Sequence, residues 1–420
     1  MTLGFHYRED VLHCEGVPLP AIADRAGTPA FVYSSSSILH NYDSYARPHG
    51  PAPHTVHYAV KANGSLGILS LLARRGAGFD IVSGGELFRV LQAGGDPAKV
   101  VFAGVGKTAD EIDYALGVGI ASFNCESEPE LQLLNARAAL RQAKAPLAIR
   151  VNPDVNAETH PYIATGLREH KFGIPITEAE PLYRRAASLP YLDIRGVACH
   201  IGSQILNIGA FLEALHKVIE LVERLRAAGI PIRDLDLGGG LGVGYKPEDE
   251  SPAIADYMTA LLQVIEGHHL HLHVEPGRSI VAQAGILLTT VLYRKPGPEK
   301  EFIIVDAAMN DLIRPALYKS HHEILPVHRA PDRPAVTADI VGPICETGDF
   351  LARNRQLQVS EPGERLAICT AGAYGFALSS NYNARPRAAE VLVDGSNFTV
   401  IRDRETYADL IRGERPAPQA

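Results

Sequence analysis

The chain has 420 residues, more than one hydrophobic core usually supports, so we expect one large domain and one smaller domain. Its formal net charge of −8 argues against the basic surface that binds nucleic acids or anionic membranes. No apolar run approaches membrane-spanning length, and the opening MTLGFHYRED lacks the apolar core of a signal peptide. The five cysteines show no metal-type spacing, which indicates free thiols in a reducing compartment and predicts a cytoplasmic protein.

Strand-like runs alternate with helical segments from about residue 35 to residue 280. The runs are HYAVK, GFDIVS, KVVFAG, ASFNCES, PLAIRVN, GVACHIG, LDLGGG and HLHVEPG. Segments between them, such as SLGILSLLARRG and FLEALHKVIELVERLRAAG, have apolar residues at helical spacing and end in glycine. This alternation predicts an α/β fold with a parallel (β/α)8 TIM-like barrel. An open, doubly wound sheet is the alternative, because periodicity alone does not distinguish the two.

After about residue 280 the pattern changes to short strands separated by Pro, Gly and charged turns. Examples are ILLTTVLYRK, EFIIVDAAM, AVTADIVGPIC, RLAICTAG and AEVLVDG. The opening FHYREDVLHCEGVPL has the same character and is expected to join them. We therefore predict a barrel domain over residues 35–280 and a β-sandwich or β-barrel domain made of residues 1–34 and 281–420.

Chemically unusual groups follow four of the predicted strands. Lys61 ends the first strand in HYAVKAN, and His200 ends the sixth. A glycine cluster, Gly238–Gly240, ends the seventh, and the EPGR run, Glu275–Arg278, ends the eighth. The carboxyl ends of the strands of a parallel barrel meet at one rim. Each group alone has a structural explanation, as a surface lysine, a core histidine, a turn or an ion pair, but their joint placement favours a functional site.

The chemistry of these groups suits one cofactor. A desolvated lysine has a lowered pKa and can condense with an aldehyde. Backbone N–H groups at a glycine cluster can bind phosphate. The Glu275 carboxylate can keep a pyridine nitrogen protonated, and the His200 imidazole can stack on a flat ring. The combination predicts pyridoxal 5′-phosphate held as a Schiff base, which explains why Lys61 ends an apolar strand.

Motifs of one known family run along nearly the whole chain. They are YAVKAN, GFDIVSGGEL, HPYIATGLREHKFGI, HIGSQI, DLGGGLGVGY, EPGRSIVAQAG, MNDLIRPALY, VGPICETGDFLA and YGFALSSNYNARPRAAEVLVDG. On these motifs the chain resembles the diaminopimelate decarboxylases, of the alanine-racemase-like (fold type III) enzymes that use pyridoxal phosphate. The family fold is a barrel followed by a β domain that includes the N-terminal strands. One departure, Thr347 in CETGD where serine is expected, leaves Cys345 and Glu346 in place.

The resemblance implies roles for individual residues. Lys61 is expected to form the Schiff base, His200 to stack on the cofactor ring, and Cys345 to act as the proton donor. The residues expected at the cofactor are Lys61, His200, Ser203, Gly239, Gly240, Glu275, Gly277, Arg278 and Tyr374. The residues expected at the substrate are Arg278, Arg314, Tyr318, Glu346 and Tyr374.

The resemblance also implies a reaction and an assembly. The expected reaction removes one carboxylate of meso-2,6-diaminopimelate as carbon dioxide and yields L-lysine, the last step of lysine biosynthesis. The implied assembly is a homodimer in which each active site takes Lys61 from one subunit and Cys345 and Glu346 from the other.

Three alternative functions stay open. A decarboxylase of another basic amino acid, or of carboxynorspermidine, would share Lys61, His200 and Cys345 but lack the Arg278–Arg314 pair aimed at a distal carboxylate. The CETGD segment and the length of the chain favour decarboxylation over an amino-acid racemase. A non-enzymatic, single-barrel cofactor-binding protein would lack the long β region after residue 280.

The run HHLHLH, His268–His273, has alternating histidines of the kind that can bind a metal ion. We expect instead a strand whose successive side chains point in opposite directions, and no metal site.

Overall fold

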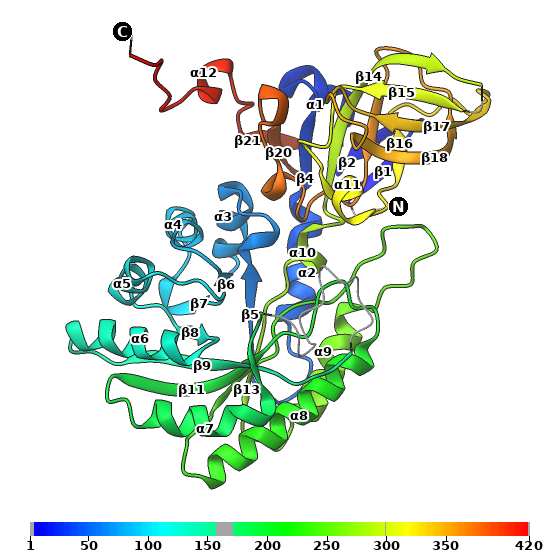
Figure 1. Cartoon of the computed structure of the whole chain (residues 1–420). Helices are drawn as coiled ribbons and strands as arrows, with labels where there is room; N and C mark the ends of the chain where they lie inside the picture. The colour runs from blue at the N-terminus through cyan, green and yellow to red at the C-terminus, as the bar shows by residue number, and fades with distance from the viewer. Residues whose placement is uncertain (1–3, 157–170, 299, 419–420) are drawn as a thin grey trace. The chain divides into compact units, whose positions relative to one another are not determined.

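The computed structural model describes residues 4–156, 171–298 and 300–418 (Figure 1). They form two compact units. The barrel unit comprises Leu39–Gly244 and Glu250–Ile280, and the β unit comprises Met1–Ile38, Tyr245–Asp249 and Val281–Ala420. The predicted domain bounds, 35–280 and 1–34 with 281–420, remain a proposal, and they do not single out the short segment Tyr245–Asp249.

Parallel strands close into a barrel in the barrel unit. Within the described residues, hydrogen bonding runs in the order β9-β11-β12-β13-β5-β6-β7-β8, and β8 pairs again with β9. This closure confirms the predicted (β/α)8 barrel and excludes the open sheet. The short β10 (Ile174–Pro175) pairs with β9. The barrel strands are β5 (His54–Ala59), β6 (Gly78–Ile81), β7 (Val100–Phe102), β8 (Ser122–Cys125), β9 (Ala145–Asn152), β11 (Leu192–Cys199), β12 (Asp234–Asp236) and β13 (His271–Val274).

Helices lie on the outer side of the barrel strands (Figure 1). In α8 (Ile208–Ala227) the buried residues recur every three or four positions, which gives the helix one apolar face to pack: they include Phe211, Leu215, Val218, Val222 and Leu225. A capping box between Thr108 and Glu111 begins α5 (Ala109–Val118). The other helices are α2 (Ser35–Ala46), α3 (Leu66–Arg74), α4 (Gly84–Gln92), α6 (Glu128–Leu140), α7 (Ile176–Ala187), α9 (Ile254–Ile265) and the short α10 (Arg278–Val281).

The β unit joins the two ends of the sequence. Strand β4 (Ala30–Ser34) pairs antiparallel with β14 (Gly285–Pro296) and parallel with β20 (Ala389–Asp394), which confirms that N-terminal strands belong to the β domain. One core contains Leu12, Val32, Ile286 and Val391. The remaining elements are β1 (Phe5–Arg8), β2 (Val11–Cys14), β3 (Val17–Pro18), α1 (Leu19–Ala26), β15 (Glu301–Val305), α11 (Arg314–Tyr318), β16 (Ile324–Pro326), β17 (Ala335–Val341), β18 (Phe350–Gln358), β19 (Arg365–Ile368), β21 (Asn397–Arg402) and α12 (Tyr407–Leu410).

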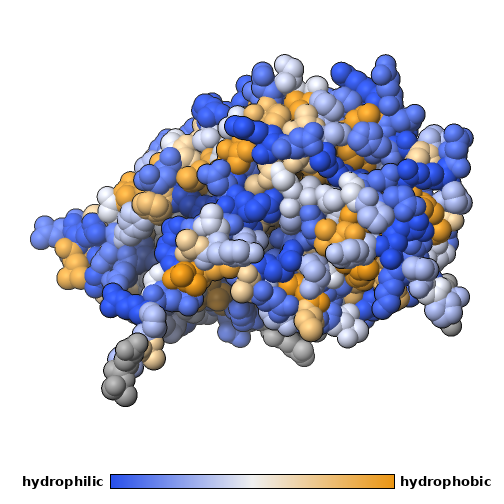
Figure 2. Space-filling model, turned by 90° about the horizontal axis from the view of Figure 1, so that it is seen from above, coloured by the Kyte–Doolittle hydropathy of each residue, from blue (hydrophilic) through white to orange (hydrophobic). Residues whose placement is uncertain are grey.

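The molecular surface is mainly hydrophilic in the view of Figure 2, where hydrophobic residues form small patches between hydrophilic ones. Tyr407, Leu140 and Tyr293 are among the most exposed large hydrophobic side chains. None of the helices described is long and apolar enough to cross a membrane.

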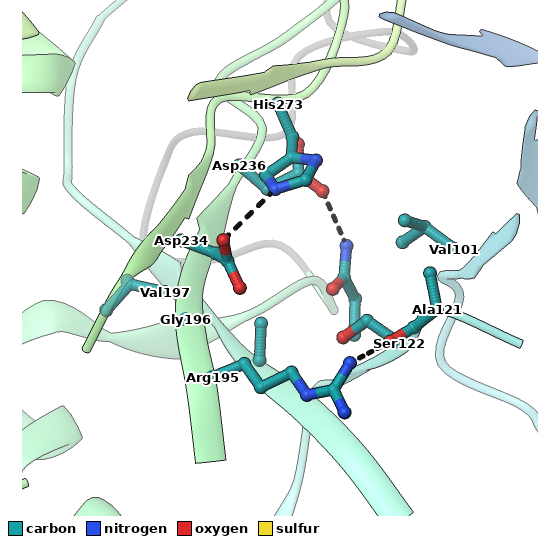
Figure 3. Close-up of a pocket in the computed structure, with 11 residues that line it drawn as sticks. Val101, Ala121, Ser122, Arg195, Gly196, Val197, Asp234, Asp236 and His273 are labelled. Atoms are coloured by element: carbon teal, nitrogen blue, oxygen red, sulfur yellow. Dashed lines mark hydrogen bonds and ion pairs between the residues drawn. The ribbon is translucent and has the colours of Figure 1, made fainter. Parts of the chain in front are cut away.

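A cavity of about 110 Å³ lies at the amino ends of the barrel strands (Figure 3). Ser122 and Asp234, the first residues of β8 and β12, line it together with Arg195 and Asp236. Asp236 accepts a hydrogen bond over 2.9 Å from Asn124 Nδ2, which also lines this cavity. The amino half of the barrel therefore contains hydrogen-bonded polar side chains among apolar ones.

The histidines of HHLHLH take part in this polar interior. His273 lies between His57 and Asp234. His273 Nδ1 is 2.8 Å from His57 Nε2, and His273 Nε2 is 3.4 Å from Asp234 Oδ1. His271 Nε2 is 2.8 Å from Thr55 Oγ1. Within the described residues, no group of three or more His, Cys, Asp or Glu side chains is arranged to hold a metal ion.

The buried histidine predicts that acid destabilises the barrel unit. Burial, and then the neighbouring His273, lowers the pKa of His57 from 6.5 to about 4. The unfolded chain takes up a proton near pH 6.5 that the folded chain does not take up until about pH 4, so the free energy of unfolding falls as the pH is lowered through this window. We expect His57→Gln to remove up to roughly 3 kcal/mol of this pH dependence, measured by urea unfolding.

The matched control is His216→Gln, because His216 is an exposed histidine on α8 whose Nδ1 contacts the Leu212 carbonyl at 2.7 Å. It should leave the pH dependence as in the wild type. An unchanged pH dependence in His57→Gln would contradict the assignment.

Candidate active site

Lys61 follows β5 in a short 3₁₀ turn, Val60–Ala62, and forms an ion pair with the neighbouring strand. Its Nζ lies 2.7 Å from Oδ2 of Asp80, a residue of β6 whose side chain is fully buried. Burial raises the pKa of Asp80, and the positive charge of Lys61 opposes that rise. The other carboxylate oxygen, Oδ1, is buried and accepts no hydrogen bond from the described residues. Lys61 therefore lies at the end of β5 beside a buried carboxylate that is only partly hydrogen-bonded.

A second cavity, of about 180 Å³, lies at the carboxyl ends of the barrel strands. It brings together three residues that the sequence predicted at the rim: Lys61, His200 and Glu275. Asn124 lines both this cavity and the one at the amino ends. The lining is completed by Val82, Ala103, Gly104, Arg150, Phe172, Ala198 and Cys199.

His200 is a neutral imidazole at neutral pH. Burial, then the charges of Arg150 and Lys61, holds its pKa well below the usual value of 6.5. A neutral aromatic ring in the wall of a cavity can pack against a flat ligand without a charge of its own.

Glu275 is the third predicted residue in the cavity. Burial, then the charges of Asp236 and Asp80, raises the pKa of Glu275 well above its usual value. Its Oε1 is buried and has no hydrogen-bond partner among the described residues. Buried polar atoms of native proteins are normally hydrogen-bonded, so this oxygen fits a donor that a ligand brings.

Two glycines allow the rim loops to approach closely. A Cβ on Gly239 would lie 2.1 Å from the Glu275 carbonyl oxygen. Gly240 has φ +115, and a Cβ there would lie 2.3 Å from the Gly202 carbonyl oxygen. The loop after β12 therefore packs against the loops that follow β11 and β13.

The other predicted rim residues lie in these same loops. Arg278 Nη2 donates to Ser203 Oγ over 2.9 Å, which ties the loop after β13 to the loop after β11. A Cβ on Gly277 would lie 2.9 Å from Cβ of Ala62, next to Lys61.

Arg314, at the start of α11, is a buried arginine of the β unit. Its guanidinium carbon lies 5.1 Å from the ring centre of Tyr245 and 5.8 Å from that of Tyr318. Only 5% of Arg314 is exposed, so this arginine lies in the interior of the β unit and not on its surface.

The remaining predicted residues also lie in the β unit. Cys345 is exposed whereas the other four cysteines are buried, and its backbone N–H donates to Asn383 Oδ1 over 3.0 Å. Glu346 Oε2 accepts a hydrogen bond from Tyr382 Oη over 2.9 Å. Tyr374 has φ +57, a strained left-handed conformation that is frequent at functional sites.

Sequence reasoning missed Asp80, Arg150 and Asp236. Asp236 accepts hydrogen bonds from Asn124 Nδ2 and Gly238 N, both over 2.9 Å, and its charge raises the pKa of Glu275. The available signal was an acidic residue inside an apolar strand, in GFDIVS and in LDLGGG.

Comparisons with known proteins agree with this geometry. The family described as "Pyridoxal-dependent decarboxylase, pyridoxal binding domain" matches residues 36–282. The chain is 57% identical to a diaminopimelate decarboxylase of Pseudomonas aeruginosa and 51% identical to one of Vibrio cholerae, over 99% of each chain. The structure of a Helicobacter pylori diaminopimelate decarboxylase complexed with L-lysine is 40% identical, with a TM-score of 0.90 over 94% of this chain and 98% of that one. The structure of an M. jannaschii diaminopimelate decarboxylase in complex with L-lysine is 37% identical, with a TM-score of 0.94. The match covers 99% of this chain and 98% of that one.

Three findings lead to one assignment. They are the closed parallel barrel, the lysine and the unsatisfied acid in the cavity at its carboxyl rim, and the full-length similarity to these enzymes. The chain belongs to the diaminopimelate decarboxylase family of the pyridoxal-dependent decarboxylases.

Proposed function

We propose that Lys61, His200 and Glu275 hold pyridoxal 5′-phosphate in the cavity at the carboxyl rim. The reaction is the decarboxylation of meso-2,6-diaminopimelate to L-lysine and carbon dioxide, which is the last step of lysine biosynthesis. The observation that carries this proposal is that these three side chains line one cavity in a chain 57% identical to a diaminopimelate decarboxylase.

The side chains of the cavity fit this cofactor. The primary amine of Lys61 suits the aldehyde, and the unsatisfied Oε1 of Glu275 suits the pyridine N–H. The neutral ring of His200 suits a flat ring, and the close loops at Gly239 and Gly240 bring backbone near a phosphate. When bound, pyridoxal phosphate supplies an electron sink for the electron pair that the departing carboxylate leaves behind.

The residues of the chain handle the protons of this reaction. Lys61 Nζ must lose a proton before it acts as a nucleophile, and Asp80 Oδ2, 2.7 Å away with a raised pKa, can accept that proton. Glu275 would share a proton with the pyridine nitrogen. The Cys345 thiol would give a proton to the carbon that lost carbon dioxide, which would leave a thiolate at Sγ.

The distal end of the substrate carries a carboxylate and an ammonium group. Arg278 and Arg314 are buried guanidinium groups that can pair with the carboxylate, because a guanidinium can hold a carboxylate through two parallel hydrogen bonds. Tyr318 and Tyr374 add hydroxyl groups, and Glu346 receives the ammonium.

A cytoplasmic homodimer with shared active sites is part of the proposal. The exposed thiol of Cys345 supports it, since a proton donor must be covered by something that excludes water during the reaction. The five free thiols suit a reducing compartment.

Borohydride reduction tests the role of Lys61. Reduction of the protein loaded with pyridoxal phosphate should fix the cofactor on the peptide that contains Lys61, as read by mass spectrometry. Lys61→Arg keeps a positive charge beside Asp80 but cannot condense with an aldehyde, so it should trap nothing. Trapping on another peptide would show that the assignment of Lys61 is wrong.

Substrate choice tests the distal pocket. Lysine and ornithine lack the distal carboxylate, so their kcat/KM as substrates should be lower than that of meso-diaminopimelate by roughly 10⁴-fold or more. Arg314→Ala should lose most activity on meso-diaminopimelate and keep the absorbance of the bound cofactor. Arg8→Ala changes an exposed arginine in β1 of the β unit and is the control, which should behave as wild type. Equal turnover of ornithine by the wild type would instead favour a general basic-amino-acid decarboxylase.

Subunit mixing tests the shared site. Lys61→Ala and Cys345→Ala proteins should each be inactive, and a mixture should recover up to about a quarter of wild-type activity, because half of randomly formed dimers are mixed and each has one intact site. Absence of recovery after subunit exchange, verified by mass spectrometry, would mean that each site is built from one chain.

A further inference from the structure

We propose that Tyr245 is a positioning residue that orients the Arg314 guanidinium and so contributes to the selection of substrates with a distal carboxylate. This inference rests on the proposed role of Arg314. The tyrosine belongs to the short segment Tyr245–Asp249, which packs with the β unit although the residues on both sides of it belong to the barrel unit.

Tyr245 contacts Arg314 in two ways. Arg314 Nη2 donates a hydrogen bond to Tyr245 Oη over 3.1 Å, and the guanidinium carbon lies 5.1 Å from the centre of the tyrosine ring. The same Nη2 lies 3.3 Å from Ser320 Oγ. One nitrogen of the guanidinium thus has two neutral oxygen acceptors, while the group as a whole lies near aromatic rings.

These contacts orient the guanidinium without neutralising it. Hydroxyl oxygens and aromatic rings attract a cation but carry no net charge. A carboxylate in the place of Tyr245 would compete with a substrate carboxylate for Arg314. The contacts with Tyr245 therefore set the direction in which the guanidinium fork points, which decides where a carboxylate can meet it in bidentate geometry.

Tyr245 is itself held by two further contacts. Asp249 Oδ2 accepts hydrogen bonds from the backbone N–H groups of Tyr245, over 2.8 Å, and Lys246, over 3.0 Å, which fixes the turn of the segment. The tyrosine ring packs edge-on against His322, with ring centres 5.4 Å apart and planes at 80°. His322 is buried, and its Nδ1 is 2.9 Å from the Cys369 carbonyl oxygen. Because both the backbone and the ring of Tyr245 are held in place, the ring can orient the arginine that lies against it.

The sequence position of Tyr245 adds a second reason. It ends the run GGGLGVGY, which begins with the glycines proposed to lie near the cofactor phosphate. One stretch of chain thus carries both a proposed cofactor contact and the residue that orients the proposed substrate arginine.

Two substitutions separate the hydroxyl from the ring. Tyr245→Phe keeps the ring beside Arg314 and loses the hydrogen bond, and Tyr245→Leu loses both. We expect KM for meso-diaminopimelate to rise about 5-fold in the Phe variant and about 30-fold in the Leu variant, with kcat changed less than KM. Bound as the product, with its side-chain amine toward the cofactor, L-lysine places its only carboxylate in the proposed distal pocket. Its Kd for the loaded protein, measured by calorimetry, should therefore rise by similar factors. Binding of cadaverine, which has no carboxylate, should not change.

The controls keep the result interpretable. Tyr293→Leu removes an exposed tyrosine of β14 and should match wild type in KM and in L-lysine binding. Thermal unfolding and cofactor absorbance report whether each variant is folded and loaded. If the Leu variant fails to fold, the Phe variant decides the matter alone.

Arg314→Ala separates the proposed role of Tyr245 from the proposed role of Arg314. If it weakens L-lysine binding while the folded Tyr245 variants bind as wild type, the inference about Tyr245 is wrong and the proposed function stands. If Arg314→Ala leaves L-lysine binding unchanged, the proposed role of Arg314 is wrong, and the inference about Tyr245 is wrong with it.

Discussion

Closure of the parallel sheet is the constraint on which the candidate site depends. Pairing of β8 with β9 turns the sheet into a barrel, and only then do the carboxyl ends of its strands surround one space. Lys61 after β5, His200 after β11 and Glu275 after β13 line one cavity for this reason, although they are far apart in the sequence. The rim loops pack so closely that a side chain at Gly239 would collide with the backbone at Glu275.

The closed barrel encloses three acidic side chains whose burial is costly unless their charges are paired or hydrogen-bonded. Asp80, Asp236 and Glu275 are all buried, and Lys61 offsets part of their charge. Burial, and then the charges of Asp236 and Asp80, raises the pKa of Glu275, whereas burial lowers the pKa of His200. The same groups that are costly to bury without a ligand are the ones that the proposed cofactor would satisfy.

Arg314 of the β unit has a different surrounding. It lies against the hydroxyl groups of Tyr245 and Ser320 and the aromatic rings of Tyr245 and Tyr318. These contacts orient the guanidinium group, which suits the proposed role of Arg314 in substrate recognition. The exposed Cys345 and the strained backbone at Tyr374 are further features of the β unit that suit a functional surface.

The sequence by itself determined the alternation of parallel strands and helices and the candidate residues at the strand ends, because both depend on local signals. Strand and helix periodicities each span about ten residues, and Lys61, His200 and Glu275 were recognisable by their position at the ends of apolar runs. Only the tertiary structure decided that the sheet closes, that Asp80 faces Lys61, and that Tyr245 lies against Arg314. Asp80 meets Lys61 because β5 and β6 pair in a register that sets Ala59 opposite Asp80. Such contacts join segments whose register and pairing are set by the packing of the whole chain, and periodicity within one segment carries no information about its partner.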